Sequence, residues 1–116
     1  MSKKLKELRS KVASLNGQGT ILKVADLEDK AFVVDVSATN NVTGKYGEQQ
    51  LIVGNYVEGD LKHTVGDEVR LYLNNRRQEV FETSYDGEGM YAFIFGASVE
   101  MKSGHSYIPL DLVEKV

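Results

Sequence analysis

From Thr20 onward, the chain alternates short runs of β-branched and aromatic residues with clusters of glycine, asparagine and aspartate. Residues of the first kind pack well on a pleated, half-buried surface, whereas residues of the second kind favour turns. The runs recur over about 95 residues and predict five to seven strands joined by short connections. This pattern is typical of a small barrel or sandwich, and we expect an all-β domain.

Alternation of apolar and polar residues marks the strands that we expect. The clearest is residues 30–39, and residues 68–74 form another. In the second of these, Val69, Leu71 and Leu73 face one way. Weaker candidates are residues 20–24, 48–57, 78–83, 90–98 and 106–113. We expect the strands at 78–83 and 90–98 to pair as a hairpin, and residues 40–47 to form a loop.

The first residues have a different, helical periodicity. Ser2 is a suitable N-cap, Asn16-Gly17 is a suitable stop, and one apolar stripe lies between them, formed by Leu5, Leu8, Val12 and Leu15. The sequence therefore predicts an N-terminal amphipathic helix at residues 1–16 and a β-rich domain at residues 17–116. The stripe has two possible partners, the core of the same chain or a second copy. Two heptads are too few to define a coiled coil.

Charge is distributed unevenly along the chain. The net charge is −3, yet residues 1–11 carry five cations and one acid, so the remaining residues sum to −7. An acidic body disfavours nucleic-acid binding, because much of that affinity comes from releasing counterions from phosphates. A local basic stripe can still act within an acidic total.

Residues suited to catalysis are few. There is no cysteine, which excludes disulfides, thiolate zinc sites and cysteine nucleophiles. His63 and His105 are far apart, and no serine, histidine and acid form a recognisable arrangement. We expect no enzyme activity, no metal and no cofactor. No apolar signal core or membrane-length stretch occurs, so we also expect a soluble, cytoplasmic protein that binds no membrane.

Tyrosines and cations group in a way that favours binding to a single strand. Such binding needs aromatic rings that stack on bases beside cations that hold phosphates. Arg70 and Tyr72 share the outward face of the strand at 68–74, and other candidates are Lys45, Tyr46, Tyr56, Arg76, Arg77 and Tyr85. Each residue taken alone also fits a structural role, because tyrosines commonly occupy half-buried strand positions.

Three segments carry a resemblance to a known family: residues 31–36 (AFVVDV), residues 45–49 (KYGEQ) and residues 64–71 (TVGDEVRL). Together they resemble small OB-fold single-stranded-DNA-binding proteins, particularly the compact ones encoded by bacteriophages of lactic bacteria. The resemblance covers residues 20–113. It implies a five-stranded, partly open barrel that binds DNA across its middle strands and between two loops. It places Lys45 and Tyr46 in the first loop, and Arg70, Tyr72, Arg76 and Arg77 on or beside the binding face.

The resemblance also implies a function. Proteins of this kind bind single-stranded DNA without strong sequence preference and protect it during replication or recombination. We therefore expect a homodimer or homotetramer in the cytoplasm of a host cell, with replication or recombination proteins as possible partners. The alternative is a protein-interaction or assembly module, for instance a small viral structural protein. That alternative predicts a flat, exposed apolar patch and no basic groove.

Overall fold

The structure is a computed structural model that describes residues 20–44 and 47–116. Its elements in chain order are β1 (Thr20–Leu22), the 3-10 helix η1 (Val24–Asp26), β2 (Ala31–Gly44), β3 (Gly47–Gly59), β4 (Glu68–Leu73), α2 (Asn75–Ser84), β5 (Gly89–Phe95), β6 (Val99–Glu100), β7 (Ser106–Tyr107) and β8 (Leu110–Lys115). The helix expected at residues 1–16 lies outside the described residues, as do Lys45 and Tyr46.

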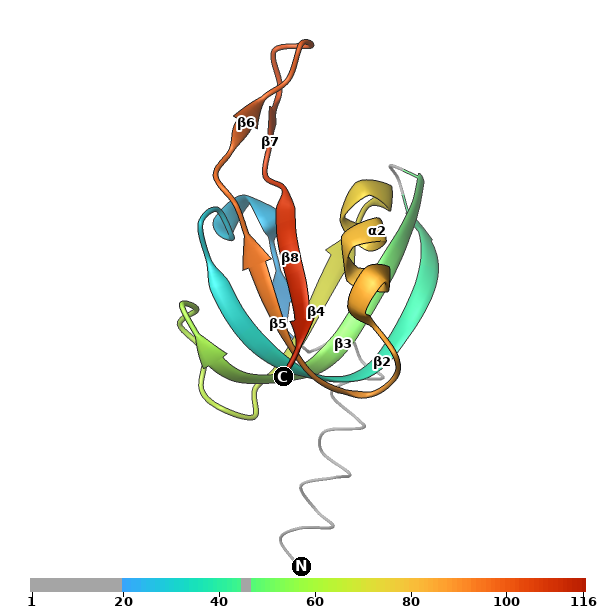
Figure 1. Cartoon of the computed structure of the whole chain (residues 1–116), viewed down its shortest axis with the longest axis vertical. Coiled ribbons are helices and arrows are strands. Elements are labelled where there is room, and N and C mark those ends of the chain that lie inside the picture. The colour runs from blue at the N-terminus through green and yellow to red at the C-terminus, as the bar shows by residue number, and fades with distance from the viewer. Residues whose placement is uncertain (1–19, 45–46) are drawn as a thin grey trace, which may run out of the picture.

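One mixed sheet dominates the fold. Its strands lie in the order β1-β4-β3-β2-β5-β8; β1 runs parallel to β4, and the other neighbours are antiparallel. Within the described residues, β6 and β7 pair only with each other, and they form an arm that projects from the sheet (Figure 1). The mostly β architecture is confirmed. The sheet has six strands and is not closed into a barrel, so the structure leaves the five-stranded barrel unconfirmed.

The sheet curls because β2 bends strongly along its length (Figure 1). The first part of β2, up to Val36, pairs with both β3 and β5, whereas the part after it pairs with β3 alone. The register shifts between Val36 and Ala38, and such a bulge bends a strand and increases its twist. Gly54 lies opposite this bend, where a Cβ atom would collide with the backbone of Asp35. Glycine therefore permits the close approach of the two strands.

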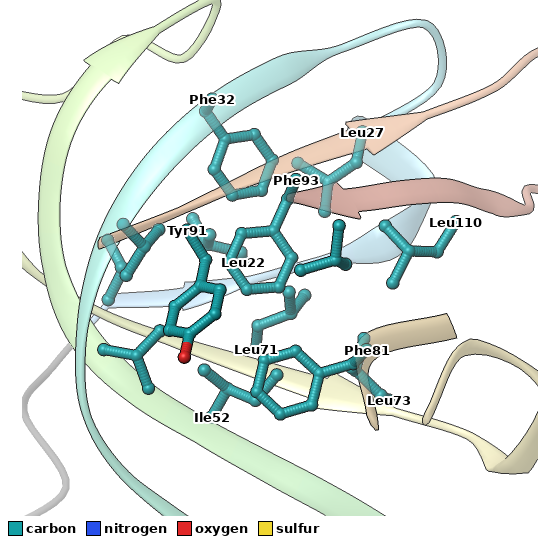
Figure 2. Packing of buried hydrophobic residues seen from close by; sticks show 14 of the residues in the cluster. Leu22, Leu27, Phe32, Ile52, Leu71, Leu73, Phe81, Tyr91, Phe93 and Leu110 are labelled. Atoms are coloured by element: carbon teal, nitrogen blue, oxygen red, sulfur yellow. The ribbon is translucent and has the colours of Figure 1, made fainter. Parts of the chain in front are cut away.

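The inner face of the curled sheet holds an aromatic core (Figure 2). Phe32, Phe93 and Tyr91 are each no more than 2% exposed. Phe81, the one buried residue of α2, stacks on Phe93 with ring centroids 5.9 Å apart. Burying a side chain of this size stabilises the folded state by about 1.5–3 kcal/mol. Phe81 thus fastens α2 across the open side of the sheet, between β8 and β3 (Figure 1).

Two expected elements were wrong. The expected strand at residues 78–83 belongs to helix α2, so the expected hairpin with residues 90–98 does not exist. The Asn74 side chain accepts a hydrogen bond from the Arg77 amide at 3.0 Å, and this N-cap starts the helix. The expected loop at 40–47 is strand as far as Gly44, because residues 40–44 continue to pair with β3.

Candidate nucleic-acid interface

The outer surface of β4 and its neighbours brings together one aromatic, one cationic and several apolar side chains. Tyr72 on β4 pairs in register with Leu51 on β3, and Leu51 pairs with Asn40 on β2. The next row places Arg70 between Val53 on β3 and Ile21 on β1. We call this surface the β3–β4 face, and it consists of Ile21, Ala38, Asn40, Leu51, Val53, Arg70 and Tyr72. The alternation that buries Val69, Leu71 and Leu73 is what turns Arg70 and Tyr72 outward.

The two functional side chains of this face differ in their surroundings. The Arg70 guanidinium lies 3.9 Å from the Glu68 carboxylate, and the side chain is only 15% exposed. Tyr72 is half-buried on the outward side of β4 and pairs with Leu51. An aromatic side chain on the outward, largely apolar side of a sheet is suited to stacking on a base. The pair predicted from the sequence thus does occur on one outward surface.

Arg76 and Arg77 lie at the start of α2, where they contact the base of the arm. The Arg77 guanidinium carbon lies 4.4 Å from the centroid of the Tyr107 ring, and that of Arg76 lies 5.6 Å away. Arg77 Nε donates to the Ile108 carbonyl at 2.9 Å, and partial burial lowers the pKa of its guanidinium. Arg77 therefore holds the arm to the helix, whereas Arg76 is exposed and open to an anionic ligand.

Two of the predicted tyrosines are not on this surface. Tyr56 is 3% exposed, and its hydroxyl donates to the Leu61 carbonyl at 3.2 Å, so its ring belongs to the core. Tyr85 follows α2 and stacks on Phe81 with centroids 4.7 Å apart. Both rings are held by packing that stacking on a base would have to disrupt.

Sequence reasoning missed a hollow with several charged side chains that adjoins the β3–β4 face. This hollow of 510 Å³ is lined by Ile21, which belongs to the face, and by Lys23, Lys30 and Lys62 among others. Asp26 and Asp60 also line it, so its charge is mixed. Lys23 and Lys30 come from the β1–β2 connection and Lys62 from the β3–β4 connection. They line one hollow only because of the tertiary fold, so no sequence spacing could have predicted it.

Tyr107 is a second residue that the sequence reasoning missed. Besides its contacts with Arg76 and Arg77, its hydroxyl donates to Asn74 Oδ1 at 3.3 Å. Because Asn74 also caps α2, the ring links β7 to the start of the helix. Tyr107 stands about thirty residues from these partners in sequence, so no local pattern could have identified the contact.

Metal-binding clusters and membrane-length helices are both absent from the described residues. Among residues 20–44 and 47–116, no group of three or more histidine, aspartate or glutamate side chains is placed to hold a metal ion. Within the same residues, no helix has the length and apolar character needed to cross a membrane. No protein-family model, curated protein or solved structure matches the chain.

Proposed function

We propose that the chain binds single-stranded DNA, with little sequence preference, on the β3–β4 face. The observation that carries this proposal is the outward placement of Tyr72 and Arg70 in register with Leu51 and Val53. A base stacked on Tyr72 would rest on an apolar surface, with Arg70 beside its phosphate. Binding of this kind protects exposed strands during replication or recombination and requires no catalytic step.

The strand order supports an OB-like fold for the described domain. Numbered along the chain, β2, β3, β4, β5 and β8 would be the five OB strands, with α2 between the third and the fourth. OB folds bind oligonucleotides on their second and third strands, between the loop joining strands 1 and 2 and the loop joining strands 4 and 5. Here those strands are β3 and β4. The flanking connections are the β2–β3 hairpin and the β6–β7 arm.

Stacking would supply more of the affinity than phosphate contacts. The described residues include eight lysines and arginines against sixteen aspartates and glutamates, a net charge of −8. Stacking contributes about 1–3 kcal/mol per base and does not need a basic protein. Contacts by Arg70 and Arg76 alone would give a slope of log affinity against log salt of about −1.4 for a single strand. We therefore expect a shallow salt dependence.

The test is fluorescence anisotropy with a labelled oligo-dT of about 35 nucleotides at low and moderate salt, with a duplex of equal length as the control. We expect the protein to bind the single strand more tightly than the duplex. Replacing Tyr72 with alanine should weaken binding about 5- to 150-fold, since the ring is lost, whereas Tyr72→Phe should keep most of the affinity. Absence of binding at micromolar protein in low salt would refute the proposal.

A protein-interaction or assembly module is the second candidate function. It is favoured by the acidity of the described residues and by an exposed apolar surface on β5 and β8, which is described below. The anisotropy experiment separates the two candidates, because an assembly module gives no signal with either nucleic acid. Analytical ultracentrifugation of the same samples would then report self-association.

A further inference from the structure

The outer surface of β2, β5 and β8 carries a second, apolar face, distinct from the β3–β4 face. Ile94 on β5 pairs in register with Ala31 on β2 and with Leu112 on β8. In the neighbouring rows, Ala92 lies opposite Val33 and Met90 lies near the end of β8. We call Ala31, Val33, Met90, Ala92, Ile94 and Leu112 the β5–β8 face. Cross-strand neighbours on one side of a sheet lie about 5 Å apart, so these side chains form a continuous surface.

This face is open to a partner in the described structure. Leu112 and Met90 are each 45% exposed. A hollow of 420 Å³ is lined by Ala31, Val33, Ala92 and Ile94 of this face, and by Glu58, Gly59 and Asp60 at the end of β3, among others. Contiguous exposed apolar surface on a small protein commonly marks a site of interaction.

The edge of the β5–β8 face is acidic. Asp35 lies opposite Met90, Glu58 opposite Val33, and Glu114 opposite Ala92. Among the residues that the structure describes, no lysine or arginine occupies any of the paired positions of this face. The surface therefore fits a partner that combines an apolar stripe with flanking positive charge.

Residues 1–16 of this same chain have that chemistry. Their stripe of Leu5, Leu8, Val12 and Leu15 is accompanied by a net charge of +4 over residues 1–11. We propose that this N-terminal segment docks on the β5–β8 face of its own chain, with the apolar stripe on Ile94 and Leu112. Its lysines would then face the acidic edge. The site is separate from the β3–β4 face, so the proposal goes beyond DNA binding and does not depend on it.

The length of the chain allows this docking. Residues 16–19 join the segment to Thr20 and extend about 13 Å. The helix that the sequence predicts for residues 1–15 would add about 22 Å, and the sum exceeds the roughly 24 Å across six strands. A tether of this kind gives an effective concentration of about millimolar, which favours the chain's own segment over a segment from a second copy in dilute solution.

Hydrogen–deuterium exchange of residues 2–16 tests the proposal, with a free peptide of residues 1–16 as the reference. We expect these amides to exchange at least about ten times more slowly in the full chain than in the peptide. Leu112→Lys should abolish that protection, because it places a cation under the basic segment. Val65→Lys is the matched control, since Val65 is 73% exposed and lies in the β3–β4 connection, off this face.

Each outcome decides the question. Protection that Leu112→Lys removes and Val65→Lys retains, at every protein concentration, supports docking within one chain. Peptide-like exchange in the full chain, or protection that Leu112→Lys leaves intact, overturns the proposal. Protection that disappears on dilution also overturns it and assigns the face to a second copy. Circular dichroism of both variants confirms that each remains folded.

Discussion

At the scale of single residues, Tyr91 combines a fully buried ring with a hydrogen-bonded hydroxyl. The hydroxyl accepts from the Asp86 amide at 3.1 Å and lies 2.8 Å from both the Asp86 carboxylate and the Gly87 carbonyl, either of which can accept its proton. Burial raises the pKa of this phenol. Lys115 Nζ donates to the same carboxylate at 2.7 Å. The three side chains tie β8 to the turn between α2 and β5.

The Asp86 carboxylate makes stability depend on acid pH. Hydrogen bonds from Lys115 first, and then from Tyr91, hold its pKa below the usual 3.8. The stabilisation is therefore complete only well above the unfolded-state pKa of 3.8, and it is lost as the pH falls through the lower pKa of the folded state. We expect the stability difference between wild type and Asp86→Asn to shrink between about pH 5 and pH 2. Urea unfolding across that range measures it, and a constant difference would contradict this role for Asp86.

At the scale of elements, the start of α2 depends on Asn74. Its Oδ1 atom caps the helix at the Arg77 amide and accepts from the Tyr107 hydroxyl. Arg77 and Tyr107 then hold the arm, whose two strands of two residues each pair with each other. An isolated hairpin is at best marginally stable in water, so these contacts at its base are needed to position it.

Loss of the cap should cost measurable stability. We expect Asn74→Ala to lower the free energy of unfolding by about 1 kcal/mol and Asn74→Asp to lower it much less, because aspartate also caps helices. Urea denaturation measures both variants. Equal losses in the two variants would mean that the capping oxygen is not what stabilises this helix end.

The sequence was enough to predict β4 and its two faces, because alternation there is uninterrupted and Arg70 and Tyr72 are polar or amphipathic. It was not enough for α2, whose one buried residue, Phe81, sits in a run that is β-like locally. Nor did it predict the burial of Tyr56. Gly54 interrupts the inward series on β3, and its role depends on the bend of β2 rather than on its own neighbours.

At the scale of the whole molecule, one curled sheet presents two outer surfaces with different chemistry. The bulge in β2 separates them: residues before it belong to the β5–β8 face and residues after it to the β3–β4 face. The first is apolar with an acidic edge, and the second carries Tyr72 and Arg70. A ligand rich in bases and a basic amphipathic segment would therefore bind on different sides of the protein.

The most direct test of the account is a methyl NMR titration of the protein with oligo-dT. We expect the methyl resonances of Leu51 and Val53, on the β3–β4 face, to shift on binding, because bases stacked on Tyr72 would lie against them. Those of Ile94 and Leu112, on the β5–β8 face, serve as the internal control and should stay unchanged. Shifts confined to Ile94 and Leu112, or no shifts at all, would contradict the assignment of the β3–β4 face to single-stranded DNA.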